Sequence, residues 1–344
     1  MNLFGAARRL KMRAFAVREM GVLLVLVGLS LALAVRALGF AEVENLLLVA
    51  RQFSMFATMG VGMTMVILTG GIDLSVGSVL ALSGCVAAKC MLGLPPHTDA
   101  HLVVLAGMVT GLATGLVCGI VNGLIVAKVG IPPFIVTLGM MSIARGLVYV
   151  ITRGWPTEVP DEFLFLGQGR IWIVPVPVVC MVVIAGGGAL FLSRTRLGRH
   201  IYAVGGNDEA ARLSGIYVDN VKLLVYALCG VLAGFAGITT ASHLSIAQPN
   251  SGITNELDVI AAVIVGGTSL AGGSGTVLGT VIGAALMGVL RNGLVLLGVS
   301  ANWQLVPLGI VIIAAVVFDQ LRQRRRERAH VRVPLDEDSS RIRD

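Results

Sequence analysis

Charge is what this 344-residue sequence lacks most. Only 13% of its residues are charged, whereas 56% are hydrophobic and the mean hydropathy is +0.89. An average soluble domain carries about 25% charged residues. The shortage of charge therefore excludes an ordinary soluble protein and predicts an integral membrane protein.

Cysteine is also scarce, and its spacing supports neither a metal site nor a disulfide framework. The sequence contains no Cys-x-x-Cys pair and no cluster of cysteine with histidine. We interpret the cysteines as small packing residues within apolar stretches. They are Cys85, Cys90, Cys118, Cys180 and Cys229.

Motifs that mark common enzymes are missing as well. A phosphate-binding P-loop needs a lysine followed by serine or threonine, but Lys11, Lys89, Lys128 and Lys222 are followed by Met, Cys, Val and Leu. The histidines are scattered, and neither Gly-x-Ser-x-Gly nor His-Glu-x-x-His occurs. We therefore expect a chain that is not an enzyme and that holds no metal and no cofactor of its own.

Long apolar runs are abundant instead. A helix needs about 20 residues to cross a bilayer. Three runs are irregular, because 45–68 contains Arg51 and Gln52, 77–93 is short, and 257–270 is short and rich in glycine. With them, ten runs predict an all-α polytopic membrane protein whose first span is uncleaved and whose termini lie on the same side. The clear runs are 20–40, 101–127, 132–151, 172–192, 220–243, 276–298 and 303–319.

Basic residues predict how these spans are oriented. Most of the 26 Lys and Arg residues fall in the N-terminus, a central hydrophilic loop and the C-terminal tail, whereas the loop 152–171 holds only Arg153 and Arg170. The positive-inside rule then predicts that the basic segments are cytoplasmic and that the tail contacts anionic lipid, with no role for nucleic acid. The cytoplasmic segments are 1–19, 193–222 and 320–344, and the transmembrane domain is 20–319.

The chain also repeats itself. "GGIDLSVGS" (70–78) matches "GGTSLAGGS" (266–274) at most positions, and each copy separates two apolar runs. Two glycine-rich breaks at equivalent places are typical of transporters that are built from two homologous halves. We therefore expect broken helices and a duplicated core of spans 2–5 and 7–10, with spans 1 and 6 as additions.

Asp73 lies within the first copy of this motif. An aspartate at the centre of a span costs roughly 2.5–3.5 kcal/mol on insertion scales, so such a residue usually faces protein or a watery cavity. Two roles are open for it. Asp73 either caps and braces the helix that follows, or accepts hydrogen bonds from a polyhydroxylated solute.

Other polar residues within or beside the spans are candidates for a solute path. For Asn122 and Asn292 the alternative is a hydrogen bond between helices, and for Arg145 it is an acidic partner or the outer membrane surface. Residues 247–262 either line an external mouth or form a solvated loop. The candidates are Asp73, Ser75, Ser78, Asn122, Thr137, Arg145, Gln248, Glu256, Asp258 and Asn292.

The central loop 193–222 is long for a connector. Its residues 207–213 have the composition of a short surface helix with Asn207 or Asp208 as the N-cap. Such a helix, on the cytoplasmic side, is either a docking surface for a partner or part of an ordinary solvated loop.

Four long stretches carry a resemblance to a known family. They are "GVGMTMVILTGGIDLSVGSVLALSG" (60–84), "IPPFIVTLGMMSIARGLVYVIT" (131–152), "GRHIYAVGGNDEAARLSGI" (198–216) and the stretch 257–304. In this order they resemble the ribose-type sugar permeases of bacterial ATP-binding-cassette (ABC) importers, within the branched-chain amino acid and ribose-type permease family. The similarity extends over about residues 45–319.

This resemblance implies a permease of the bacterial inner membrane that imports a monosaccharide, ribose or a similar pentose, by alternating access. It implies a dimer with a second copy or a paralogue, a cytoplasmic ATPase with two fused nucleotide-binding modules that holds ATP and Mg²⁺, and a periplasmic sugar-binding protein. A sugar alcohol or furanose-like signalling molecule is an alternative solute, and an ion-driven secondary transporter is an alternative mechanism.

The resemblance also implies that the segment 205–215 is the helix that couples this chain to the ATPase. We expect Ala211 and Leu213 to pack against the ATPase, Glu209 and Arg212 to make polar contacts with it, and the glycines to turn the chain at both ends. The segment's candidate residues are Gly205, Gly206, Asn207, Glu209, Ala210, Ala211, Arg212, Leu213 and Gly215.

Overall fold

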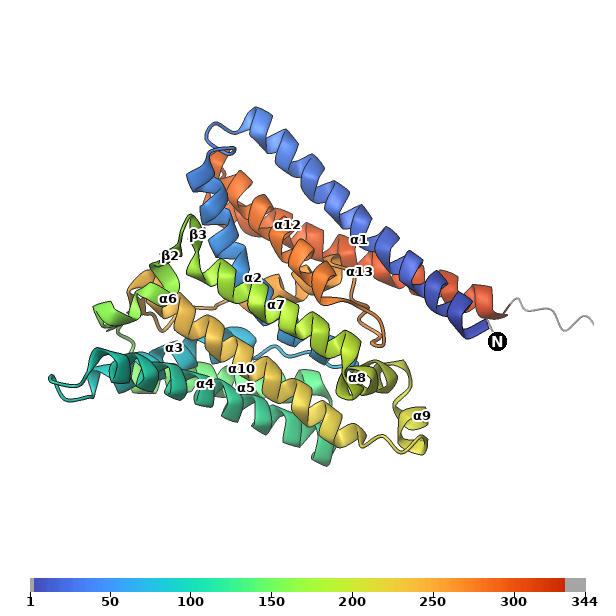
Figure 1. Ribbon diagram of the computed structural model, residues 1–344, viewed down its shortest axis with the longest axis horizontal. Helices are drawn as coiled ribbons and strands as arrows, with labels where there is room; N and C mark the ends of the chain where they lie inside the picture. Colours follow the sequence, from blue (N-terminus) through green and yellow to red (C-terminus); the bar gives the residue numbers. More distant parts are fainter. Residues whose placement is uncertain (1–2, 332–344) are drawn as a thin grey trace, which may run out of the picture.

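A computed structural model describes residues 3–331 as a bundle of long α-helices (Figure 1). The predicted basic tail lies outside the described residues from position 332 onward. The helices are α1 (Leu3–Arg36), α2 (Val43–Leu68), α3 (Val76–Leu92), α4 (Ala100–Leu124), α5 (Pro133–Thr152), α6 (Phe165–Gln168), α7 (Val176–Arg194), α8 (Arg196–Gly206), α9 (Asp208–Leu213), α10 (Val218–Leu244), α11 (Asn255–Val265), α12 (Val277–Leu296) and α13 (Ala301–Val331).

Short elements complete the fold. A π-helical turn, η1 (Ile125–Val129), extends α4, and a 3-10 turn, η2 (Asp161–Phe163), precedes α6. Two antiparallel strand pairs have two residues in each strand. One pair joins β1 (Thr157–Glu158) to β4 (Ile246–Ala247), and the other joins β2 (Arg170–Ile171) to β3 (Val174–Pro175).

The all-α polytopic class that the sequence predicts is confirmed. Among the described residues, seven helices are long and apolar enough to cross a membrane, and α3 and the apolar part of α13 are shorter. Each of the ten predicted runs contains an α-helix, but α11 has only 11 residues. The number of complete crossings and their orientation therefore stay predictions.

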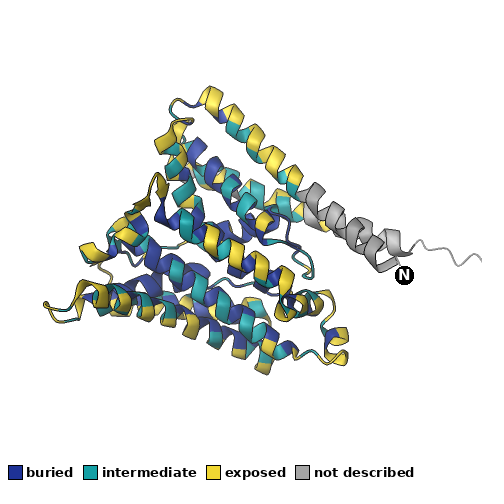
Figure 2. Cartoon of the chain, in the orientation of Figure 1, coloured by how far each residue is buried: buried dark blue, intermediate teal, exposed yellow. Residues whose placement is uncertain are grey.

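Apolar side chains cover much of the outer surface of the bundle. Val35 and Val150 are 87% and 74% exposed. In Figure 2, exposed residues cover the coloured part of α1 and the outward faces of the other helices, whereas buried residues lie between the helices. Such a surface is unfavourable in water and favourable in lipid. The burial pattern therefore agrees with a membrane-embedded chain.

Two sets of four helices have matching neighbours. In the first set α3 packs on α4 and α5, and in the second α11 packs on α12 and α13. Helix α10 packs on α3 and α4, just as α2 packs on α11 and α12. Helices α2 and α10 are antiparallel, because Thr240 contacts Met55 whereas Cys229 lies against Gly62. The predicted duplication of spans 2–5 and 7–10 is thus an inverted repeat of α2–α5 and α10–α13.

The sequence match that suggested this duplication joins places that are not equivalent. Residues 70–78 follow α2, whereas residues 266–274 follow α11. In the inverted repeat, the counterpart of the α2–α3 connection is the α10–α11 connection, 245–254. Each matched stretch ends its helix with a left-handed glycine, Gly70 at φ 80° and Gly267 at φ 103°, but these two glycines are one position apart in the match.

Glycines also allow two central helices to pack very closely. Gly111, Gly115 and Gly119 recur at every fourth position along α4 and face α10. A Cβ atom at Gly115 would overlap the carbonyl oxygen of Gly230, and one at Gly230 would overlap that of Gly115. Small residues at this spacing are typical of helix contacts in membranes. They hold the core of the first set against α10.

Candidate functional site

The connection between α2 and α3 is the predicted helix break. Helix α2 ends at Leu68, and the amide of Gly71 returns to the carbonyl of Val66 at 3.1 Å. Residues 69–75 are then non-helical until α3 begins at Val76, although Asp73 and Ser75 are each only 1% exposed. The polar side chains of the break are therefore covered by protein, as polar groups at a helix break within a membrane have to be.

Asp73 braces this break from within. Its Oδ1 accepts hydrogen bonds from the amide of Ser75 at 2.9 Å and from the hydroxyl of Ser75 at 2.6 Å. The amide group of Asn122 on α4 donates to the same hydroxyl at 3.0 Å, and Cys229 on α10 lies close to the carboxylate. Ser75, not Asp73, is the N-cap residue of α3. Asp73 thus supports the turn that precedes α3, and its contact with a solute stays a prediction.

Two more candidates from the sequence lie beside Asp73. The hydroxyl of Thr137 on α5 donates to the carbonyl of Pro133 at 2.9 Å and contacts that of Ile72 at 3.3 Å. Ser78 is buried in the first turn of α3. The fold therefore gathers one buried polar cluster at the break, formed by Asp73, Ser75, Ser78, Asn122, Thr137 and Cys229.

Arg145 has partners that the sequence did not predict. Its Nη1 donates to the carbonyls of Pro249 at 2.7 Å and Ser251 at 2.8 Å. These carbonyls belong to residues 245–254, which fold back onto α3 so that a Cβ atom at Gly77 would overlap the carbonyl oxygen of Gly252. The stretch 247–262 is therefore not a freely solvated loop, since its start is folded into the bundle.

The remaining candidates in this stretch take different positions. The carboxylate of Glu256 lies against Gly77, and Gln248 is half-buried. Asp258 forms an ion pair with Arg291 at 2.8 Å between α11 and α12. These contacts place Glu256 beside the start of α3, whereas Asp258 braces two helices of the second set.

Asn292 has a reciprocal partner on α2. Its amide nitrogen donates to Oδ1 of Asn45 at 2.9 Å, and the amide nitrogen of Asn45 donates back at 3.1 Å. A hydrogen-bonded amide pair between two helices satisfies both side chains without a solute. The structure therefore supports the helix-bridging alternative for Asn292.

A short helix, α9, lies at one end of the bundle, the α9 end (Figure 1). Asn207 caps it by accepting a hydrogen bond from the amide of Ala210 at 2.9 Å, which confirms the predicted surface helix and selects Asn207 as its cap. Gly215 ends the segment at φ 80°. Leu213 is 88% exposed, and Glu209 and Ala210 are exposed too.

Two expectations for this segment are wrong. Ala211 is only 4% exposed and packs in the chain's own core, so it does not face a partner. Gly205 and Gly206 are the last residues of α8 and do not form a turn. A Cβ atom at Gly205 would overlap the carbonyl oxygen of Leu68, so this glycine permits the close approach of α8 to α2. Composition alone does not show which side of so short a helix faces inward.

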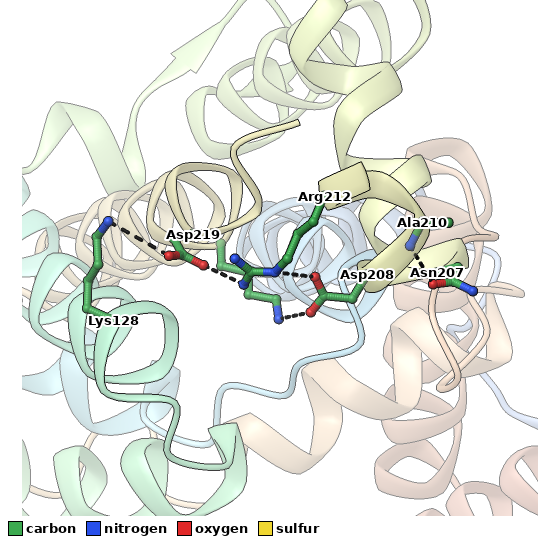
Figure 3. A network of polar contacts seen from close by, with 7 residues as sticks. Lys128, Asn207, Asp208, Ala210, Arg212 and Asp219 are labelled. Atoms are coloured by element: carbon green, nitrogen blue, oxygen red, sulfur yellow. Dashed lines mark hydrogen bonds and ion pairs between the residues drawn. The ribbon is translucent and has the colours of Figure 1, made fainter. Parts of the chain in front are cut away.

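Ion pairs hold α9 to the rest of the bundle (Figure 3). Arg212 contacts Asp219 on α10 at 2.6 Å and Asp208 at 3.4 Å, and Lys222 contacts Asp208 at 2.6 Å. Lys128 on η1 lies 3.9 Å from Asp219. The hydrogen bond to Asp219 raises the pKa of Arg212 above its usual value. Arg212 therefore pairs within the chain. Of this network, only the four-residue spacing of Asp208 and Arg212 is visible in the sequence.

An exposed apolar pair lies beside this network. Leu213 and Tyr217 are 88% and 80% exposed at the α9 end. Tyr217 also lines a surface pocket of 320 Å³ together with Lys128, Arg212 and Ile216. Exposed aromatic and apolar side chains surrounded by polar residues are typical of interaction sites. We call Leu213, Tyr217 and this pocket the docking surface. Sequence reasoning missed Tyr217, whose position directly before the apolar run of α10 was the available signal.

The described residues include no group of three or more His, Cys, Asp or Glu side chains that could hold a metal ion.

Comparisons with known proteins agree on one family. A family model described as "Branched-chain amino acid transport system / permease component" matches residues 45–316. The ribose import permease protein RbsC of Escherichia coli (strain K12) is 47% identical over 289 residues, which are 83% of this chain and 88% of that protein. The ribose import permease protein RbsC of Bacillus subtilis (strain 168) is 45% identical over 284 residues, 82% of this chain and 86% of that protein.

A permease for a different sugar is also similar. The D-allose transport system permease protein AlsC of Escherichia coli (strain K12) is 40% identical over 284 residues, which are 82% of this chain and 85% of that protein. No solved structure matches the chain.

Proposed function

The chain belongs to the family of permease components of branched-chain amino acid transport systems, and we propose that it is the membrane-spanning subunit of an ABC importer for ribose or a similar monosaccharide. Identity of 47% over more than four fifths of the chain to a ribose import permease supports this solute class. Another similar permease is named for D-allose, which is also a monosaccharide, so we propose this class of solute and not ribose alone. A sugar alcohol, a furanose-like signalling molecule and an ion-driven transporter are not favoured by these relatives.

The geometry supports a path that opens at the helix break. The buried polar cluster around Asp73 lies where α2, α3, α4, α5 and α10 meet. Its side chains carry hydroxyl, amide and carboxylate groups, which are the groups that bind the hydroxyls of a sugar. In the present state, which we take as the closed one, Ser75 is bonded to Asp73 and Asn122, and Thr137 is bonded to backbone carbonyls. Exchange of these bonds for bonds to a solute is the role that we propose for Asp73, Ser75, Ser78, Asn122 and Thr137.

The outer and inner ends of the path follow from charge. The N-terminus, the segment with α8 and α9, and the C-terminal tail carry most of the basic residues, so we place the α9 end in the cytoplasm of a bacterial inner membrane. Residues 245–254, which Arg145 holds against α3, then lie on the periplasmic side. A periplasmic sugar-binding protein would deliver the solute there.

The docking surface is the single observation that supports an ATP-driven mechanism. Leu213 projects almost fully from a capped helix that two ion pairs, Arg212–Asp219 and Lys222–Asp208, hold against α10. A rigid helix with an exposed apolar side chain suits the groove of a cytoplasmic ATPase. This partner would hold ATP and Mg²⁺, carry two fused nucleotide-binding modules and bind a pair of permease chains, either two copies or this chain with a paralogue. The permease itself performs no hydrolysis.

Leu213→Asp tests this contact. A charge placed at the centre of an apolar contact should reduce recovery of the ATPase about tenfold or more in a pull-down through a tag on the permease. Leu92→Asp is the matched control, because Leu92 is an exposed leucine at the opposite end of the bundle. Ala210→Glu should act like Leu213→Asp, since Ala210 is exposed on the same helix. Undiminished recovery with both α9 variants would contradict the proposal.

A further inference from the structure

A second pocket lies at the α9 end, between the helix break and α9. Its volume is 240 Å³, and its walls come from the break at Gly71, from η1 at Ala127, from the turn before α5 at Pro132, and from Arg212, Lys222 and Tyr226. The pocket is therefore lined both by the α2–α3 break and by α9, the helix that we assign to the ATPase contact.

One wall of this pocket carries a buried polar atom without a partner. Tyr226 is 1% exposed, and its hydroxyl makes no hydrogen bond among the described residues. The hydroxyl lies at the break, because a Cβ atom at Gly71 would overlap it. Buried hydroxyl groups are nearly always hydrogen-bonded in folded proteins. An unsatisfied hydroxyl at the wall of a pocket is free to bond to a molecule that enters the pocket.

The pocket lies next to the buried polar cluster along three elements. On α10, Cys229 lies one turn beyond Tyr226, and on α4, Asn122 lies one turn beyond Val126. On the break, Asp73 follows Gly71 by two residues. Each of the three walls therefore continues into a residue of the cluster, so a solute that leaves the cluster towards the α9 end enters this pocket next.

The pocket is also connected to the position of α9. Arg212 is a residue of α9, and Lys222 is bonded to Asp208 at the start of α9 at 2.6 Å. Both basic side chains line the pocket. A displacement of α9 relative to α10 would therefore also move the pocket wall formed by Arg212 and Lys222, because the ion pairs connect these side chains to both helices.

We propose that this pocket is an inner binding site for the transported solute, a polyhydroxylated monosaccharide, and that α9 controls its opening through Arg212 and Lys222. The inference rests on the proposed function. The Tyr226 hydroxyl and the backbone groups of the break bind hydroxyls of the sugar before it is released into the cytoplasm. Solute binding then satisfies the hydroxyl that is unsatisfied in the closed state.

Tyr226→Phe separates this role from a structural one. Phenylalanine fills the same space without the unsatisfied hydroxyl, so the thermal stability of the detergent-solubilised complex should be unchanged or higher. Ribose uptake by the complete importer should nevertheless fall about tenfold, the typical effect of losing one hydrogen bond to a bound solute. Tyr149→Phe is the control and should transport normally, because Tyr149 is a half-exposed residue of α5 outside the pocket.

Thiol labelling tests occupancy of the pocket independently of transport. Ala127→Cys lines the pocket, whereas Val129→Cys is an exposed site on the same π-helical turn outside it. In inverted membrane vesicles, ribose should slow labelling of the residue-127 thiol severalfold and leave the residue-129 thiol unaffected. Normal uptake by Tyr226→Phe together with no protection at position 127 would overturn the inference while wild-type ribose uptake still supports the proposed function. Absence of ribose uptake by the wild-type importer would overturn the proposed function itself.

Discussion

At the scale of single residues, buried polar groups explain why a chain with so little charge retains an aspartate in its interior. Asp73 accepts two hydrogen bonds from Ser75, and Asn122 bonds to the same serine. These bonds satisfy polar groups that the helix break would otherwise leave unpaired in an apolar environment. Burial of such groups without partners costs about 1–3 kcal/mol each, so Asp73 stabilises the break as a unit with its neighbours.

Substitutions of Asp73 test this bracing role. Asn retains an oxygen that accepts the bonds from Ser75, so Asp73→Asn should keep most transport. Leucine leaves the Ser75 amide and hydroxyl unpaired, so Asp73→Leu should destabilise the break by about 2–3 kcal/mol and abolish uptake. Uptake by each variant is compared at equal membrane abundance. Equal losses in the two variants would show that the negative charge itself is required.

The sequence predicts the identity of these polar residues better than their partners. Asp73, Ser75 and Asn122 are recognisable because polar residues in apolar runs are few. The partners of Arg145 are not, because they are backbone carbonyls of a loop more than 100 residues away in the chain. Tyr226 escapes notice for a related reason. It lies in an apolar helix, and only the fold shows that its hydroxyl meets the break at Gly71.

At the scale of elements, glycine sets how closely helices and connections approach. Gly77 in the first turn of α3 lies against the carbonyl of Gly252, and Gly115 on α4 lies against that of Gly230. No larger residue fits at these places without moving the backbone. The close contacts let residues 245–254 pack on α3 and let α4 pack on α10.

Valine at Gly77 tests the importance of this contact. The added side chain would overlap Gly252 and Glu256, so Gly77→Val should displace residues 245–254 and reduce uptake strongly, with a stability loss of about 1–3 kcal/mol from overpacking. Gly21→Val is the control, because no atom lies within 4 Å of a Cβ atom added there. Membrane abundance and uptake are measured for both variants. Equal tolerance at the two positions would contradict the account of the break.

The sequence predicts where elements begin and end better than it predicts how they pack. The N-cap signature of Asn207 is local, so the start of α9 follows from the sequence, whereas the burial of Ala211 depends on packing against other elements. The match of 70–78 with 266–274 correctly indicated breaks in both halves. It did not identify equivalent positions, because an inverted repeat of α2–α5 and α10–α13 pairs the α2–α3 connection with the α10–α11 connection.

At the scale of the whole molecule, the inverted repeat brings two equivalent connections to the first turn of α3. Residues 69–75 lead into this turn, and Gly252 of residues 245–254 lies against Gly77 within it, with the polar cluster beside the first connection and Arg145 beside the second. Alternating access requires two states that differ in which end of the path is open. Movement of these connections in turn, with α9 transmitting the state of the proposed ATPase, is the mechanism that we propose for this arrangement.

ATP-dependent uptake of ribose into liposomes is the measurement that tests this account most directly. The permease is reconstituted with its ATPase and its sugar-binding protein, and labelled ribose is followed with ATP supplied on the α9 side. We predict uptake that requires ATP and the binding protein and that is lost with Leu213→Asp but retained with Tyr149→Phe. Uptake that proceeds without ATP and follows an ion gradient instead would contradict the central claim that this chain is the membrane path of an ATP-driven importer.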